Sequence, residues 1–120
     1  MSDYKIKSRI WIEVGDNVLV GEGRVRLLKE IETLGSLSKA AKSIGMSYKK
    51  AWTLVDAVNR SAKQAVVTTS VGGQKGGGTV ITPYGKKLIV AFDIINKKCW
   101  EFLDQEFEML NEILKDTKLE

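Results

Sequence analysis

Apolar and polar residues alternate near the start of the chain. Between Ser8 and Val20, the apolar residues Ile10, Ile12 and Val14 share one parity, and a break at residues 15–17 precedes three further apolar residues. Alternation with a period of two predicts strands, and the break predicts a turn. The segment is therefore expected to form a β-hairpin, or one strand with an irregular turn.

After residue 24 the apolar residues recur at the three- and four-residue steps of a helix. Arg24 to Leu34 carries one apolar face, which predicts a core helix. Two shorter helical patterns follow between Gly35 and Arg60. Gly45 lies between them and tolerates the positive φ that a tight turn requires. The apolar positions are Ala40, Ala41 and Ile44 in the first pattern, and Ala51, Leu54, Val55 and Val58 in the second.

The second of these two helices begins with hydroxyl and cationic side chains. Two short helices joined by a tight turn, with such side chains at the exposed start of the second, are typical of a helix-turn-helix that reads DNA. Ser47 is a good N-cap for the second helix, and Met46 fills the corner before it. Side chains placed in this way reach both phosphates and base edges. We assign to this DNA interface Ser36, Ser38, Ser47, Tyr48, Lys49, Lys50 and Thr53.

A glycine-rich segment follows, between two short β patterns at residues 65–70 and 79–82. Two strands around a loop predict a wing, whose Gln74 and Lys75 would lie against a DNA backbone. The glycines do not have the spacing of a Walker phosphate-binding loop, and the chain is too short for a dinucleotide-binding fold. A plain connector is the alternative to the wing.

Thr82 and Pro83 are typical of a helix start, since the hydroxyl caps and proline suits the first helical position. A helix from there to about Lys115 would be roughly 50 Å long at 1.5 Å per residue. Its apolar stripe has the steps of three and four expected of a seam for a partner helix. The stripe favours a homodimer over the alternative, a core helix within one chain. Its residues are Leu88, Phe92, Ile95, Cys99, Leu103, Phe107, Leu110 and Leu114.

Charge is distributed unevenly along the chain. Nine Lys and Arg residues face one acid between residues 36 and 87, whereas seven acids face two lysines between residues 101 and 120. The basic block coincides with the predicted helix-turn-helix, which indicates a phosphate-binding face, and the acidic tail would be held away from DNA. A solvated charged surface is the alternative for either block alone.

Composition limits the remaining possibilities. The 120 residues suit one domain with an appendage, and no apolar run is long enough for a membrane span. The start is too polar for a signal peptide, so we expect a cytoplasmic protein. With one cysteine, Cys99, and no histidine, we expect neither a metal site, nor a cofactor, nor an enzyme. Trp11 and Trp52 are expected to pack rather than to stack on bases.

These segments resemble a known family, the N-terminal DNA-binding domain of ModE-type molybdate-responsive regulators, whose winged helix is related to that of LysR-type regulators. The resemblance covers about residues 23–88 and rests on GRVRLLKEI, GSLSKAAKSIGMSYKKAW, a following Asn59, GGQKGGGT and ITPYGKKL. It implies that the helix starting near Tyr48 enters the major groove, that the wing touches the backbone, and that flanking elements hold a dimer. Full-length members also carry C-terminal oxyanion-binding domains, and this sequence ends about where they would begin.

The sequence thus predicts a mainly α fold with a small β wing. Residues 1–82 would form a winged helix-turn-helix, and residues 83–120 a long dimerisation helix with an acidic tail. The predicted function is sequence-specific binding of a palindromic duplex DNA by a homodimer that regulates transcription. A protein-interaction module with a winged-helix fold is the competing prediction. The operator, the direction of regulation, and any sensing of molybdate or tungstate stay open at this level, so the chain is either a stand-alone DNA-binding homologue or a sensor by another route.

Overall fold

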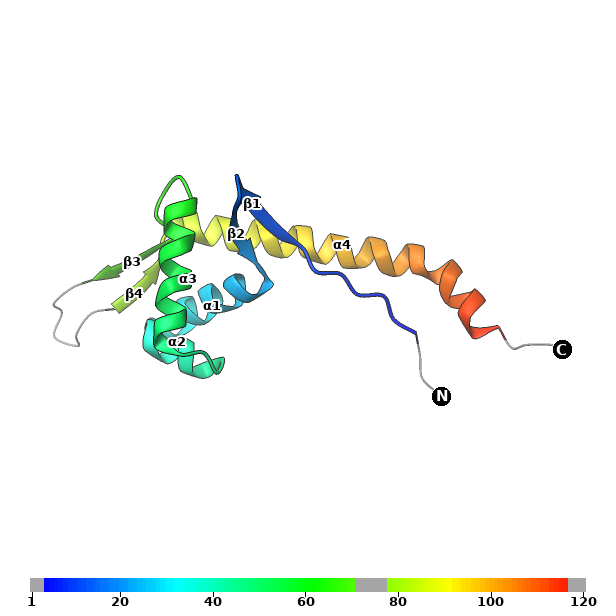
Figure 1. Cartoon of the computed structure of the whole chain (residues 1–120), viewed down its shortest axis with the longest axis horizontal. Helices are drawn as coiled ribbons and strands as arrows, with labels where there is room; N and C mark the ends of the chain where they lie inside the picture. The colour runs from blue at the N-terminus through cyan, green and yellow to red at the C-terminus, as the bar shows by residue number, and fades with distance from the viewer. Residues whose placement is uncertain (1–3, 71–77, 117–120) are drawn as a thin grey trace.

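The computed structural model describes residues 4–70 and 78–116, and in these ranges it is mainly helical (Figure 1). Four helices and two small sheets span 73 × 30 × 22 Å in the described part of the chain. The elements are β1 (Trp11–Val14), β2 (Asn17–Gly21), α1 (Glu22–Leu34), α2 (Leu37–Ser43), α3 (Tyr48–Ser61), β3 (Val67–Ser70), β4 (Gly78–Ile81) and α4 (Pro83–Lys115).

Both sheets are antiparallel pairs. Strands β1 and β2 pair from Trp11–Gly21 to Val14–Asn17, with a register shift after Ile12, so the predicted hairpin is confirmed. Strands β3 and β4 pair in regular register from Val67–Ile81 to Ser70–Gly78, which confirms the two predicted strands.

Helix α1 lies at the centre of the core. Leu27, Leu28 and Ile31 are almost completely buried, and α4 covers them with Ile89 and Phe92 from its first turns. The predicted core helix is therefore confirmed. The helix ends at Leu34 as predicted, but the Leu34 side chain is exposed and does not belong to the buried apolar face.

Caps and turns lie where the sequence placed them. Gly45 has φ +68° in the turn between α2 and α3, and the Ser47 hydroxyl accepts a hydrogen bond from the Lys50 N–H at 3.1 Å. The Thr82 hydroxyl accepts one from the Gly85 N–H at 3.0 Å, directly before Pro83. These groups satisfy backbone donors that a helix start leaves free.

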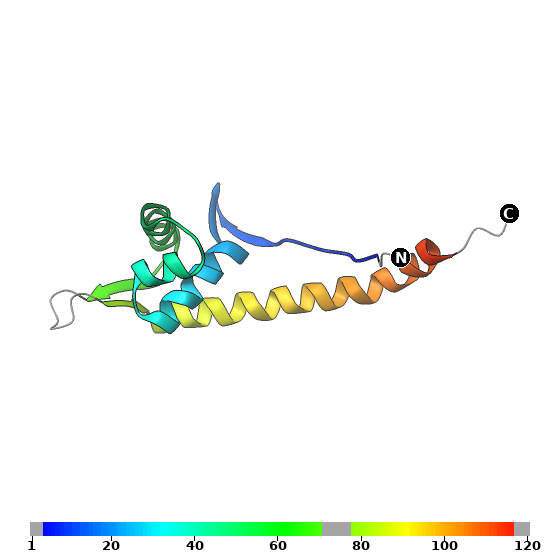
Figure 2. The same ribbon diagram turned by 90° about the horizontal axis from the view of Figure 1, so that it is seen from below.

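Helix α4 has 33 residues and extends well beyond the body of the molecule (Figures 1 and 2). The N-terminal segment, residues 4–10, runs alongside it as an extended chain (Figure 2). Ile6, Ser8 and Ile10 are half-buried in alternation, and Ser8 Oγ lies 3.6 Å from Cys99 Sγ. The part of the predicted seam around Cys99 is thus partly covered by the N-terminal segment of the same chain, and not only available to a partner helix.

The start of α4 packs so closely on Val66, the residue before β3, that only glycine fits there. A Cβ built on Gly85 would lie 2.6 Å from the Val66 carbonyl oxygen and 2.9 Å from Val66 Cγ1. We expect Gly85→Ala to lower the free energy of unfolding by about 1–3 kcal/mol, the usual range for overpacking. Gly23→Ala in α1 is the matched control, because nothing lies within 4 Å of its Cβ, and it should be neutral or stabilising. Thermal melts compare the two, and equal melting temperatures would contradict the close packing.

Candidate nucleic-acid interface

Helices α2 and α3 are joined by a short turn that is fixed by backbone hydrogen bonds. The Gly45 N–H donates to the Lys42 carbonyl at 3.1 Å, and the Met46 N–H donates to the Ala41 carbonyl at 2.9 Å. Ala40 and Ala41 are buried, so their small side chains let neighbouring helices approach. The arrangement is the helix, tight turn and second helix that the sequence predicted.

Helix α3 lies at the outside of the body, on the opposite side of α1 from α4 (Figure 2). Its inner side is anchored in the core by Ala51 and Val58. We define the outward face of α3 as the exposed residues of its first two turns. They are Tyr48, Lys49, Lys50, Trp52 and Thr53.

Two tryptophans lie elsewhere than predicted. Trp52 is 53% exposed, one helical turn from Tyr48, which is 55% exposed, and Trp11 is 52% exposed on β1. Trp11 and Trp52 were predicted to be core or packing residues, and a place in the core is wrong for both, because each is about half exposed. Trp52 instead adds an aromatic surface to the outward face of α3, since residues four apart are neighbours on a helix.

The hydroxyl residues assigned to the interface have different surroundings. Ser36 and Ser47 both cap helices, since their oxygens accept from the N–H of Lys39 and of Lys50, each at 3.1 Å. The Thr53 hydroxyl donates to the Lys49 carbonyl at 2.9 Å, which leaves its lone pairs free to accept. Ser38 is exposed in the first turn of α2. Among the assigned serines and threonine, only Ser38 and Thr53 thus present a hydroxyl that is not already a cap.

Asn59 joins α3 to the β3–β4 hairpin. Its Oδ1 accepts from the N–H of Val66 at 2.8 Å and of Val67 at 3.0 Å, and its Nδ2 donates to the Val67 carbonyl at 2.9 Å. Buried Thr79 joins β4 to α2, because its Oγ1 accepts from the Leu37 N–H at 3.2 Å. These bonds fix the hairpin beside α3, as Figure 1 shows. The predicted tip residues Gln74 and Lys75 lie outside the described residues.

An ion pair on the outer side of α3 was missed by the sequence reasoning. Arg60 Nη2 lies 3.0 Å from Asp56 Oδ2, and both residues are only partly covered. Their spacing of four residues on a predicted helix was the signal that could have identified the pair. Arg60 therefore has an acidic partner on its own helix, unlike Lys49 and Lys50, for which the described part of the chain shows no ion pair.

The predicted seam of α4 is divided between two surroundings. Phe92 is only 1% exposed and belongs to the core of its own chain, so its side chain is not presented to a partner helix. Cys99, Leu103 and Phe107 are half-buried. The remaining seam residues, Leu88, Ile95, Leu110 and Leu114, range from half-buried to exposed.

A row of exposed apolar side chains on α4 follows the edge of the predicted seam and includes one seam residue, Ile95. We define the α4 stripe as Ile95, Phe102, Met109 and Ile113, which are separated by steps of seven, seven and four, and all are at least half exposed. Such steps put side chains on one side of a helix. No helix in residues 4–70 and 78–116, α4 included, is both long and apolar enough to cross a membrane.

Comparison with curated proteins identifies relatives among molybdenum-related regulators. The chain is 39% identical over 95 residues to the DNA-binding transcriptional dual regulator ModE of Escherichia coli K12, a match of 76% of the chain and 36% of that protein. It is 33% identical over 113 residues to the molybdenum transport protein ModE of Azotobacter vinelandii, covering 94% of the chain and 42% of the relative. The molybdenum-pterin-binding protein MopB of Rhodobacter capsulatus is 41% identical over 104 residues, or 83% of the chain and 38% of MopB.

These matches support a relationship to a family of regulators. The chain spans about two fifths of the length of these three relatives. No family model matches the chain. The predicted resemblance to ModE-type proteins is therefore confirmed at the level of named relatives, whereas the functions of the individual residues stay predictions.

Proposed function

We propose that this protein is a transcriptional regulator that binds duplex DNA as a homodimer, with α2, α3 and the β3–β4 hairpin acting as a winged helix-turn-helix. The observation that carries the proposal is the outward face of α3. It presents Lys49 and Lys50 beside the exposed aromatic rings of Tyr48 and Trp52, on a helix anchored from behind. Cations position a protein on phosphates, whereas the other side chains contact base edges.

The distribution of charge supports a nucleic-acid partner. The excess of Lys and Arg between residues 36 and 87 includes the α3 face, and the five acids between residues 101 and 112 lie on the distal half of α4. Phosphates are attracted to the basic part, and the acidic half of α4 extends away from α3 (Figure 1). Several relatives are named as ModE transcriptional regulators, which agrees with this assignment.

The α4 stripe supports a second copy of the chain as the partner of this helix. Exposed apolar side chains in a row along a long helix are typical of an interface. The charges on α4 favour an antiparallel pair, because its first half carries mainly lysines and its second half mainly acids. The lysines are Lys86, Lys87, Lys97 and Lys98, and the acids are Glu101, Asp104, Glu106, Glu108 and Glu112.

Two measurements on the purified chain separate this proposal from a protein-interaction module. Gel shift with genomic fragments should show bands that a specific competitor removes, and analytical ultracentrifugation should show a dimer at micromolar concentration. A protein-interaction module would instead bind no duplex DNA above the non-specific level. Its α4 would also stay unpaired until another protein is added.

Tyr48 and Thr53 are the residues we propose for base readout. Tyr48→Ala and Thr53→Ala should each weaken binding to the specific site by about 5- to 150-fold, the equivalent of about 1–3 kcal/mol for one base contact. Binding to unrelated duplex DNA should change less than about twofold, because phosphate contacts dominate there. Thr33→Ala, at an exposed position on α1, is the control. Equal losses on both kinds of DNA would contradict a role in readout.

A further inference from the structure

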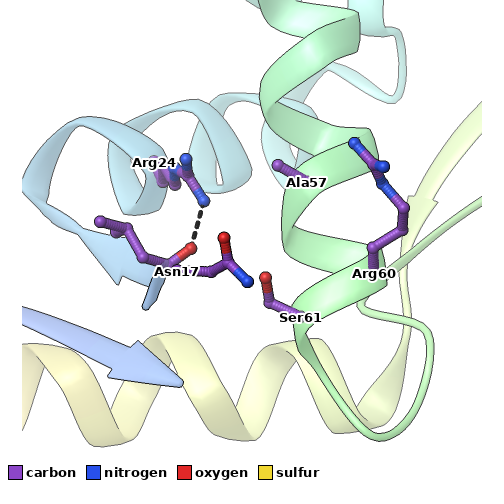
Figure 3. A pocket seen from close by; sticks show the side chains of 6 residues that line it. Asn17, Arg24, Ala57, Arg60 and Ser61 are labelled. Carbon is purple, nitrogen blue, oxygen red and sulfur yellow. Dashed lines mark hydrogen bonds between the residues drawn. The ribbon is translucent and has the colours of Figure 1, made fainter. Parts of the chain in front are cut away.

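A polar cavity of about 200 Å³ lies between the end of α3, the start of α1 and strand β2 (Figure 3). Its volume corresponds to roughly six or seven water molecules. It is lined by Asn17, Val18, Arg24, Ala57, Arg60 and Ser61, none of which is acidic. The proposed DNA interface does not use this cavity.

Arg24 is the central cation of the cavity. Its Nη1 donates to the Val18 carbonyl at 2.6 Å and is 3.5 Å from the Leu19 carbonyl, which holds the guanidinium in place. These bonds use only part of its five N–H donors. Within residues 4–70 and 78–116, no carboxylate forms an ion pair with Arg24. A half-buried guanidinium usually has an anionic partner, so its free edge suits an anion.

Three other side chains give the cavity further hydrogen-bond donors. In the view of Figure 3 the Asn17 side chain lies between Arg24 and Ser61, and all three residues line the cavity. Arg60 comes from the last turn of α3 and is directed along the helix, consistent with its ion pair to Asp56. Ala57 leaves space, because its side chain is a single methyl group. The end of α3 carries about half a negative charge, which opposes an anion, but the full positive charge of Arg24 outweighs it.

A neighbouring cavity of about 260 Å³ shares Val18 and Arg24 with the first. It adds Arg9 and Lys50 to the lining, against one acid, Glu22. The two cavities thus adjoin at Val18 and Arg24. Arg24 therefore also lines a cavity that reaches Lys50 of the proposed DNA interface.

We propose that the cavity around Arg24 binds a phosphate-type oxyanion. Arg24 supplies charge, to which Arg60 adds when it leaves Asp56, and Asn17 and Ser61 supply neutral donors. The anion is either a free inorganic oxyanion or a phosphate of the DNA backbone, and in the second case the inference rests on the proposed function. Two arms of one experiment distinguish these sources.

The first arm titrates the full chain with inorganic phosphate and sulfate, without DNA, at constant ionic strength set by chloride. Amide resonances of the cavity residues should shift in a saturable way in nuclear magnetic resonance spectra. Ala57→Glu should abolish these shifts, because it fills the cavity with a carboxylate, whereas Ala65→Glu, at an exposed position outside it, should not. Arg60→Gln should weaken binding by about two- to fivefold, and Asp56→Asn should tighten it by releasing Arg60. A purely structural role for these residues predicts no such opposite effects.

The second arm measures duplex DNA binding of the wild type, Ala57→Glu and Ala65→Glu at several salt concentrations. A backbone phosphate in the cavity predicts that Ala57→Glu weakens binding more than Ala65→Glu and lowers the log-log salt slope by about 0.9. Equal losses in the two variants, together with no saturable anion shifts in the first arm, would overturn the proposal. Identical shifts with chloride alone would also overturn it. If the wild type still binds duplex DNA, either of these outcomes overturns the anion site alone and leaves the proposed function in place.

Discussion

Replacing Lys49 and Lys50 together by alanine should weaken DNA binding by about 60-fold at 0.1 M salt. The expected size follows from counterion release. Each phosphate contact contributes about 0.9 to the slope of log affinity against log salt concentration, so two contacts contribute about 1.8. Between a 1 M reference and 0.1 M salt, this slope corresponds to about 60-fold in affinity. Both side chains are exposed at the start of α3, so the fold should not change. Fluorescence anisotropy with labelled duplex DNA, repeated from 0.05 to about 0.3 M salt, measures the affinity and the slope together.

The matched control replaces another adjacent pair, Lys86 and Lys87, by alanine. This variant has the same net charge, and both lysines are exposed on α4. It should retain most of the affinity and the full slope. If the two double variants lose affinity equally, overall charge explains the binding and the outward face of α3 is not the interface.

Replacing Phe102 and Met109 together by aspartate should convert a dimer into a monomer. These side chains are 60% and 75% exposed in the single chain, so they contribute little to its own core. Burial against a partner would stabilise the dimer by about 1–2 kcal/mol per side chain, and symmetry counts each side chain twice. The dimer dissociation constant should therefore rise by at least about a thousandfold, which corresponds to about 4 kcal/mol, the lower end of this range. Sedimentation equilibrium measures this change, and thermal melting checks the fold.

Val90→Asp is the control for the α4 variant. Val90 is also exposed, but it lies about 120° around the helix from Phe102 at 100° per residue. This variant should remain dimeric and bind DNA normally. The monomeric variant should lose most of its affinity for a two-fold symmetric site, although its α3 is unchanged. A wild-type protein that is monomeric at micromolar concentration would contradict both the dimer and the symmetric site.

Local sequence signals predicted most of the elements correctly. Capping residues and glycines act through their own backbone neighbours, so Ser47, Gly45 and Thr82 were assigned from the sequence and lie where expected. Apolar spacing identified the buried face of α1 in the same way. These features need no knowledge of distant contacts.

Features that depend on tertiary contacts were predicted less well. The cover of α4 by the N-terminal segment was missed, although Ile6 and Ile10 share the parity that continues into β1. Trp52 was expected to pack because its side chain is large and apolar, but its position on α3 directs it to solvent. Which side of α3 faces the core depends on tertiary packing. The Arg24 cavity joins residues from three elements, and no spacing in the sequence indicates it.

Selection from a random library of duplex DNA tests the central claim most directly. The purified chain is used to enrich bound sequences over several rounds, and the bound complex is then sized. The account predicts an enriched inverted repeat, bound by two copies of the chain and not by the Lys49 and Lys50 double variant. An enriched pool without a shared sequence, or with a single half-site bound by one copy, would contradict a homodimer that reads duplex DNA through α3.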